Sequence, residues 1–313
     1  MSREETTNTL LDSIGLEPRH VLAPDVAFVQ VHHNEVLGVH LVPGLAVDAE
    51  EMEDGIRARV VVAAGAVIKK PVHVCFGMLP EEGLQQVLLD IQVEEAARAD
   101  VLAHCTFPNA KRVEHRMDAQ ITVGAGARYS YFERHVHGPH GGVVVLPKAH
   151  VTVGEEARFQ TEFELLSGRA GQVDIDYEIA CQARSVTEMT ARIKGRGTDT
   201  IRIQETARLE GEKARAVLAS HLALRDEARG EVHNTLIASA PGARGHVDCK
   251  EVVLDNAVAK AVPIVEVGHP SAHVTHEAAI GSVDSKQLET LLTRGLTEDE
   301  ATELIIDGLL SRS

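Results

Sequence analysis

Tryptophan is absent from this chain of 313 residues, and aromatic side chains make up only 3% of it. With 44% apolar residues the chain can still bury a substantial core, so wholesale disorder is excluded. That core has to be built from small and β-branched side chains, which favour regularly stacked strands over an irregular interior. The length allows one large domain or two ordinary ones.

Basic residues and long apolar runs are also scarce. Lys and Arg number 31 against 47 Asp and Glu, and the formal charge of -16 would repel a phosphate backbone, so we expect no nucleic-acid partner. No apolar run approaches the roughly 20 residues that a membrane-spanning helix needs, so we expect no membrane partner. The segment Met1–Glu5 is polar and acidic, unlike a signal peptide. We therefore expect a cytoplasmic protein.

Only four cysteines are present, and no two of them form a C-x-x-C pair. A disulfide framework and a zinc ribbon are both excluded by this number and spacing. Burial as a small hydrophobe is the ordinary interpretation of such a cysteine, and we adopt it for Cys181. The chain also lacks a G-x-x-x-x-G-K-[ST] phosphate loop, so it should bind no nucleotide and any hydrolysis must come from a partner.

A 30-residue repeat is the dominant positive feature. An Ala-Arg pair follows an alternating apolar segment at Ala97, Ala127 and Ala157. Alternation bounded by turn residues predicts strands from about 58 to 280. Small residues in register favour a β-solenoid, with a β-sandwich as the alternative. The pair recurs at Ala183, Ala214, Ala228 and Ala243, and the last intervals near 15 residues indicate half-coils.

The last thirty residues change to helical periodicity. Leu288, Leu291 and Leu292 form an apolar stripe, Asp284 or Ser285 can cap the helix, and Gly295 can end it. A capping box over Thr297–Glu300 opens a second helix. Its apolar face should hold Ala301, Leu304, Ile305 and Leu309. On structural grounds alone, this pair of helices would cover the open end of the solenoid.

The order of residue types near the carboxyl end is specific. Cys249 is followed by Pro263, then by His276 and Glu277, and then by the two predicted helices. This order closely resembles the carboxy-terminal signature of the SufB/SufD family, which are scaffold components of iron–sulfur cluster assembly. The resemblance is densest over roughly 210–310.

The resemblance implies a mainly β fold, a right-handed parallel β-helix with a C-terminal helical subdomain. We accordingly divide the chain into an N-terminal segment (1–57) of a short helix plus strands, a β-helix core (58–283) and a helix-turn-helix (284–313). The resemblance also implies that the terminal helices dock an ABC ATPase of the SufC type. The residues expected to contact it are Leu288, Leu291, Arg294, Gly295, Leu296, Ala301 and Ile305.

The same resemblance implies a cluster site at Cys249, His276 and Glu277. Thiolate, imidazole and carboxylate can hold iron and release it. Loop lengths allow Asp248 to take the place of Cys249. Adjacent residues on a strand point to opposite faces, so one member of each couple should face a shared site. Without the resemblance, His276 would be interpreted as an ordinary hydrogen-bonded strand histidine.

The His276-Glu277 form looks SufB-like, and the short amino-terminal part indicates a minimal version. We therefore expect a homodimer formed through the end of the β-helix, with the ligands of two subunits facing each other.

Two upstream clusters contain further candidates. Cys105 is the strongest upstream thiol candidate, because the imidazole of the preceding His104 can lower the pKa of a neighbouring thiol. Burial of Cys105 in the solenoid interior is nevertheless the favoured interpretation. His135, His137 and His140 have a spacing able to bind Zn²⁺ or Fe²⁺. Because the chain contains 17 histidines, such a cluster can also arise by chance.

Three hypotheses for function follow. The first is a non-enzymatic scaffold that builds an iron–sulfur cluster with a SufC-like ATPase and passes it to apoproteins. The second is a metal-dependent enzyme on a β-helix, which would need histidines stacked one coil apart, such as His104 and His135. The third is a structural adaptor for the ATPase. The cluster type, [2Fe–2S] or [4Fe–4S], stays open.

Overall fold

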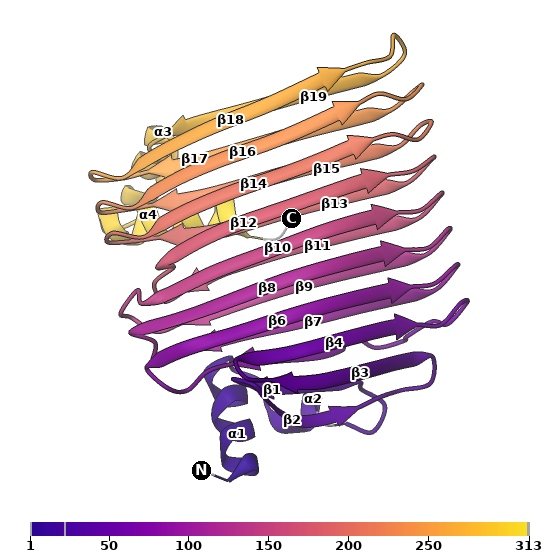
Figure 1. Cartoon of the computed structure of the whole chain (residues 1–313). Coiled ribbons are helices and arrows are strands. Elements are labelled where there is room, and N and C mark those ends of the chain that lie inside the picture. The colour runs from indigo at the N-terminus through magenta and orange to yellow at the C-terminus, as the bar shows by residue number, and fades with distance from the viewer. Residues whose placement is uncertain (1, 22, 312–313) are drawn as a thin grey trace.

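Two long β-sheets face each other along the molecule (Figure 1). The computed structural model describes residues 2–21 and 23–311. Consecutive strands from β4 onward alternate between the sheets, so two strands complete one coil of a parallel β-solenoid. The solenoid prediction is confirmed, and the sandwich is excluded because from β4 onward the neighbours within each sheet are parallel and one coil apart. Only the pairs β1–β2 and β3–β4 at the amino end are antiparallel among the described strands.

The first sheet has the order β19-β17-β15-β13-β11-β9-β7-β5-β1-β2 and the second β18-β16-β14-β12-β10-β8-β6-β4-β3. The strands of the first sheet are β1 (Phe28–His32), β2 (Glu35–His40), β5 (Val72–Gly77), β7 (Arg98–Phe107), β9 (Arg128–His137), β11 (Arg158–Ser167), β13 (Val186–Gly195), β15 (Arg215–Leu224), β17 (Arg244–Val253) and β19 (His273–Gly281). Those of the second are β3 (Leu45–Met52), β4 (Gly55–Val62), β6 (Glu82–Val93), β8 (Arg112–Val123), β10 (Val143–Val153), β12 (Gln172–Cys181), β14 (Thr200–Leu209), β16 (Arg229–Ala238) and β18 (Val258–Val267). The helices are α1 (Arg3–Ser13), α2 (Pro18–Val21), α3 (Ser285–Leu292) and α4 (Glu298–Leu310).

The Ala-Arg repeat marks where strands begin. Arg98, Arg128 and Arg158 pair in register at the first positions of β7, β9 and β11. The shorter intervals occur because Arg215 opens β15 while Arg229 opens β16 in the other sheet. The half-coil interpretation is therefore confirmed. The alanines before these arginines are buried at the turns and include Ala127, Ala157, Ala214, Ala228 and Ala243, all with 0% exposure.

Each coil keeps its apolar side chains inside. In β14 the residues alternate between buried and more exposed along the whole strand. Parallel sheets are usually covered on both faces, but here one face of most strands is polar and exposed to solvent. The alternation of buried and exposed residues shows which side chains point into the space between the sheets. The candidate site residues described below lie in that interior.

The two ends of the stack differ. At the amino end, α1 and α2 pack over the outer face of the first sheet, where Leu11, Ile14 and Val21 surround Cys75. At the other end, β18 and β19 form the last coil, and within residues 2–21 and 23–311 no strand covers it. Val267 and Ile280 on this coil are 50% and 49% exposed. The solenoid therefore ends on an open apolar edge.

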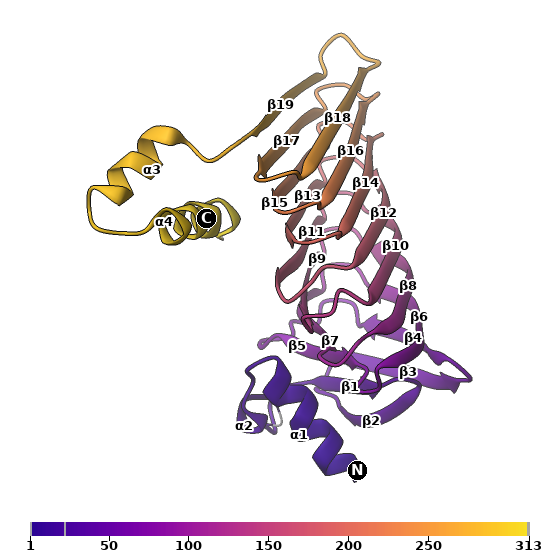
Figure 2. The same ribbon diagram turned by 90° about the vertical axis from the view of Figure 1, so that its left-hand side faces the viewer.

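The terminal helices do not cover this edge. Figure 2 shows α3 and α4 set to one side of the stack. Ile306 and Leu310 of α4 pack against Ala223, which lies on the outer face of β15. The interpretation of the helices as a lid on the open end is therefore wrong, because their apolar contacts are made with the flank of the solenoid.

Helix boundaries follow the predicted signals. The Asp284 carboxylate accepts a hydrogen bond from the backbone N–H of Gln287 at 2.7 Å and caps α3. Gly295 ends the turn with φ +94°. Thr297 and Glu300 form the reciprocal capping box of α4. These elements could be predicted because each signal lies within four residues of the boundary that it sets.

The predicted buried face of α4 is wrong in part. Ala301 is buried, but Leu304 is 52% exposed. The helix instead buries Thr302, Ile306 and Leu310. The reason is that α4 has two apolar flanks, and the one predicted from the sequence faces the groove toward α3.

Candidate functional site

Cys249 lies inside the second coil from the end. Its sulfur is buried on the inward face of β17, beside Asn234 of the facing strand β16, whose amide nitrogen is 3.8 Å away. The same amide donates to the hydroxyl of Ser220 at 3.0 Å. Ser220 is the in-register partner of Cys249 one coil below. The thiol is thus buried beside polar side chains from two neighbouring coils.

The strand register determines which candidates share this interior. Val247 pairs with His276, Asp248 with Glu277, and Cys249 with Ala278. Because side chains alternate along a strand, Cys249 and His276 both belong to the inward face, while Asp248 and Glu277 belong to the outer face. His276 and Glu277 are exposed, since nothing within the described residues covers the last coil. The structure thus brings Cys249 and His276 to one face and separates both from the two carboxylates.

Asp248 is engaged on the outer face. Its carboxylate accepts hydrogen bonds from Lys250 at 2.9 Å and from His221 at 3.2 Å. Partial burial acts to raise the pKa of Asp248, but these two hydrogen bonds lower it below its ordinary value. Its register partner Glu277 lies one coil nearer the end. Asp248 and Glu277 therefore belong to the outer face and not to an inward ligand set.

Burial controls the protonation of the inward groups. It raises the pKa of the Cys249 thiol to about 12, assisted by the carboxyl groups of Glu251 and Glu205. It also raises the pKa of Glu251 to about 7 and that of Glu205 to about 8. A metal ion bound here must therefore displace protons, and the three acidic groups can then supply negative charge that balances it.

Glu205, Asn234, Ser220 and Glu251 were missed by sequence reasoning. Neither carboxylate oxygen of Glu251 has a hydrogen-bond partner among the described residues. The signal available in the sequence was the alternation along the strand. Glu205 occupies an inward position after Ile201 and Ile203, and the other inward positions of β14 are apolar. Without the register, nothing in the sequence relates these positions to Cys249.

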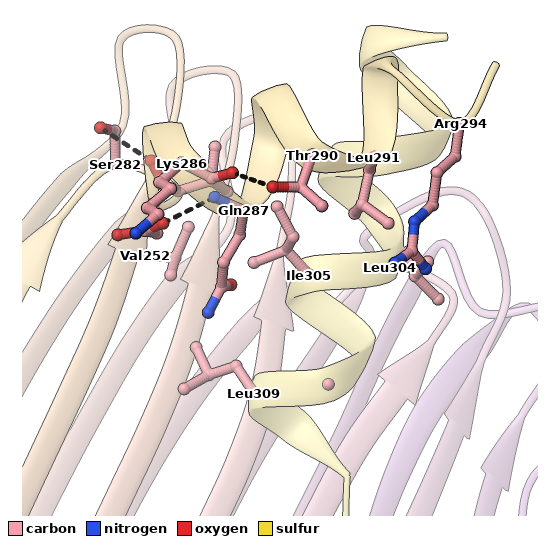
Figure 3. Close-up of a pocket in the computed structure, with 13 residues that line it drawn as sticks. Val252, Ser282, Lys286, Gln287, Thr290, Leu291, Arg294, Leu304, Ile305 and Leu309 are labelled. Atoms are coloured by element: carbon pink, nitrogen blue, oxygen red, sulfur yellow. Dashed lines mark hydrogen bonds between the residues drawn. The ribbon is translucent and has the colours of Figure 1, made fainter. Parts of the chain in front are cut away.

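A groove lies between the terminal helices and the solenoid (Figure 3). Its volume is about 900 Å³, and its walls are mainly apolar side chains with Lys286 and Arg294 at the rim. Among the residues predicted to contact a partner, Leu291, Arg294 and Ile305 line this groove. Of the others, Leu288 and Leu296 are half-buried, and Gly295 is exposed in the turn. Ala301 is a buried residue of α4.

Charged contacts hold α4 against the flank. Glu303 accepts from Arg225 at 2.8 Å, and Asp307 accepts from Lys194 at 2.6 Å. Arg196 lies 3.3 Å from Glu303. These cations belong to β13 and to the turns after β13 and β15, so the helix is tied to coils well below the last one.

Cys105 lies on the inward face of β7. Burial raises its pKa well above the ordinary value, and the adjacent Glu133 carboxyl raises it further. The burial favoured from the sequence is confirmed. His104 does not lower this pKa, because it points to the other face, where its ring stacks on His73 with centroids 5.8 Å apart. His104 pairs with Arg134 in the next coil, whereas Cys105 pairs with His135. The histidine stack required by the enzyme hypothesis is therefore not formed by His104 and His135.

The predicted histidine cluster is divided. His135 and His137 both point into the interior, with Nδ1 of the first 3.2 Å from Nε2 of the second. His140 is exposed in the turn that follows β9. Burial lowers the pKa of both inward imidazoles to about 3, so they are neutral. Cys181 is buried as predicted, 3.3 Å from the hydroxyl of Thr187.

Comparison with known proteins identifies the family of this chain. Residues 78–309 match the family model described as "SUF system FeS cluster assembly, SufBD core domain". The chain belongs to the SufBD family. A SufBD family protein of Methanocaldococcus jannaschii is 34% identical over 99% of both chains. Another, from Pyrococcus horikoshii, is 35% identical over 91% of this chain and 87% of its own.

Both relatives are named as iron–sulfur cluster assembly proteins of the SufBD family. The family to which this chain belongs is thus described as a family of iron–sulfur cluster assembly. In the part of the chain that the structure describes, no helix has the length and apolar character needed to cross a membrane.

Proposed function

We propose that this SufBD protein is a scaffold on which iron and sulfide are assembled into a cluster at the open end of the solenoid, for transfer to apoproteins. The observation that carries the proposal is the placement of Cys249 and His276 on the inward face of the last two coils, beside an exposed apolar edge. Thiolate and imidazole are both ligands of iron–sulfur clusters. The proposal assigns this chain no catalytic residue.

The ligand number favours a homodimer. Clusters of the [2Fe–2S] and [4Fe–4S] types take four protein ligands, mostly thiolates and imidazoles, and within the described residues of the last two coils one chain brings one thiol and one imidazole, Cys249 and His276, to this face. A second copy meeting the first at its last coil would double the set. Val265, Val267 and Ile280 are 37%, 50% and 49% exposed there, and such an apolar edge suits burial against an equivalent edge.

The proposal includes a SufC-like ABC ATPase bound to α3 and α4. The groove between these helices offers Leu291, Leu304 and Ile305 to a partner, with Arg294 at its rim. The chain has no phosphate loop of its own, so the partner would supply nucleotide hydrolysis. Acidic contacts of α4 with Lys194 and Arg225 would transmit movement of the helices to the solenoid.

Anaerobic reconstitution with iron and sulfide tests the cluster site. The unsubstituted protein should gain visible thiolate-to-iron charge-transfer absorbance, which Cys249→Ser should lose and His276→Ala should weaken. Cys181→Ser is the matched control, since it removes another buried thiol and should leave the absorbance intact. Unchanged absorbance in both site variants would remove the assignment.

Light scattering tests the dimer. Val267→Asp should shift the protein to a monomer and abolish cluster retention although Cys249 is present. Val217→Asp is the control, because Val217 is 38% exposed on the outer face of β15, away from the last coil. A monomeric unsubstituted protein would contradict the shared site.

Pull-down with the ATPase tests the docking surface. Leu304→Asp in the groove should reduce capture by tenfold or more. Val39→Asp, at a 44% exposed position on β2 at the opposite end of the stack, should have no effect. Full capture by a chain lacking residues 285–313 would show that the ATPase binds elsewhere.

A further inference from the structure

A second group of metal-ligand side chains lies deep inside the solenoid, near its amino end. Cys105 comes from β7, His115 from β8 and Glu133 from β9, and all three are buried. One ligand atom of each lies within 4.8 Å of the other two. The sulfur of Cys105 is 3.7 Å from a carboxylate oxygen of Glu133. We propose that these three residues bind a divalent transition-metal ion, Zn²⁺ or Fe²⁺.

The separations suit such an ion. Metal–ligand bonds of about 2.0–2.3 Å place the ligand atoms of a tetrahedral site about 3.5 Å apart. The Cys105–Glu133 separation is already close to this value, and small side-chain rotations would bring in the imidazole. Three protein ligands leave one position open for a small ligand within the interior.

His115 has no other explanation in the structure. Its side chain is only 1% exposed, and neither ring nitrogen has a hydrogen-bond partner among the described residues. Its nearest ring neighbour is Phe107, with centroids 5.1 Å apart. Buried polar groups are nearly always satisfied, so an imidazole held without a partner against Glu133 and Cys105 indicates a missing ligand.

A chain of hydrogen bonds orients the carboxyl group. The backbone carbonyl of Arg169 can only accept, so Nδ1 of His137 donates to it at 2.9 Å. The Nε2 of His137 must then accept from Nδ1 of His135 at 3.2 Å. The Nε2 of His135 is left as an acceptor, 2.7 Å from Glu133.

Without a metal, this direction requires Glu133 to carry the proton that it donates to His135. In the metal-free protein His135 and His137 therefore act as positioning residues for Glu133, and not as ligands. Once Glu133 has released this proton to bind an ion, it can no longer donate to Nε2 of His135, so its carboxylate has to turn from His135 toward the ion.

Charge balance selects the class of ion. Binding would displace one proton from the Cys105 thiol and one from the Glu133 carboxyl, while His115 stays neutral. One thiolate and one carboxylate then neutralise a single divalent cation, so no net charge is left in the apolar interior. A mixed sulfur, nitrogen and oxygen set suits ions of borderline softness and is unsuited to Mg²⁺ or Ca²⁺.

The inference does not depend on the cluster site, because Cys105 and Cys249 belong to coils far apart in the stack. The test therefore uses the full chain with Cys249→Ser, expressed with added Zn²⁺ or Fe²⁺ and purified without oxygen. Metal analysis should find about one ion per chain. X-ray absorption at the metal edge should show one sulfur neighbour at about 2.3 Å and lighter neighbours at about 2.0–2.1 Å. The energy of the X-ray absorption edge distinguishes Zn²⁺ from Fe²⁺.

Added Cys105→Ala should remove the sulfur neighbour, and His115→Phe should reduce the metal content at least tenfold while filling the space beside Phe107. Cys75→Ser is the matched control, since it removes a buried thiol from the outer face of the adjacent strand β5. Circular dichroism checks the fold of each variant.

A parent chain that binds neither ion, or binds one without a sulfur neighbour, overturns the proposal even where the variants do not fold. A folded His115→Phe protein with full metal content overturns it too.

Discussion

The side-chain amide of Asn234 lies 3.8 Å from the sulfur of Cys249, and the two residues come from opposite sheets of the solenoid. The amide is fully buried and also donates to Ser220, so it is held in place. It lowers the pKa of the thiol against the stronger effect of burial, which keeps that pKa near 12. A thiol that would otherwise be inert thus has one preorganised donor facing it.

Removing this donor should weaken iron binding. Asn234→Leu keeps the size of the side chain but deletes the hydrogen bond, which is worth about 1.4 kcal/mol or tenfold in affinity. Titration with ferrous iron under anaerobic conditions measures the change. Asn256→Leu, in an exposed turn, should bind as the unsubstituted protein does. Equal affinities for both variants would show that the amide does not act on the site.

The buried carboxyl groups predict a pH dependence of stability. Burial raises the pKa of Glu205 from 4.5 to about 8. Between these values the folded protein binds more protons than the unfolded chain, so this residue makes the free energy of unfolding fall as pH rises. Glu205→Gln removes that loss.

We therefore expect the variant to gain stability relative to the unsubstituted protein from pH 5 to pH 8, by a few kcal/mol at most. Urea unfolding at several pH values measures the difference. Glu178→Gln is the control, at an exposed position facing outward on β12, and should give a constant difference. If the difference in free energy of unfolding between Glu205→Gln and the unsubstituted protein did not change with pH, the burial argument would be contradicted.

Asp199 should be important for the stability of the stack. Its carboxylate is 1% exposed and accepts from the Arg169 guanidinium at 2.8 Å and from three backbone N–H groups, those of Ala170, Gly171 and Arg196. Asp199→Asn leaves donors unpaired in a buried place and should cost roughly 2–4 kcal/mol.

Urea unfolding measures this cost. Asp174→Asn breaks a surface ion pair with Arg202 at 3.6 Å and should cost at most about 0.5 kcal/mol. Similar costs for the two substitutions would mean that the Asp199 network contributes little.

The charged contacts of α4 should set how easily the helix leaves the flank. Glu303→Gln weakens the interactions with Arg225, Arg196 and Lys194, which should lower the local opening free energy of α4 by about 1 kcal/mol. Hydrogen exchange of the α4 amides measures this as about fivefold faster exchange. Glu289→Gln on the exposed face of α3 serves as the control. Exchange that is unchanged in Glu303→Gln would show that apolar packing alone holds the helix.

The coils could be predicted from the sequence because the Ala-Arg spacing reports a strictly local geometry. Each pair marks a turn, and the interval between Ala127 and Ala157 is the length of one coil. The two caps at Asp284 and Thr297 were predictable for the same reason. What decides these features lies within a few residues of them.

The interior groups could not be found in this way. The sequence spacing allowed His104 to be one coil from His135, but the residue that pairs with His135 is Cys105. This shift of one residue exchanges the inside of the solenoid for the outside. The meeting of Cys249 with Asn234, and of Cys105 with His115 and Glu133, depends on pairing between the two sheets. Sequence spacing within a coil does not specify which residues face each other across its interior.

The attachment of α4 to β13 and β15 has a mechanical meaning. Two of the residues that hold the helix are Lys194 and Arg225. Lys194 lies in β13, the third strand below β19 in the same sheet, and Arg225 lies in the turn after β15, the second strand below β19. A force applied to the helices therefore reaches His276 through the hydrogen-bonded ladders of β15, β17 and β19, as well as through the short linker after β19. The helices and the open edge would thus be coupled mechanically, because α4 is attached two coils below the last one and the strands between them are joined by backbone hydrogen bonds.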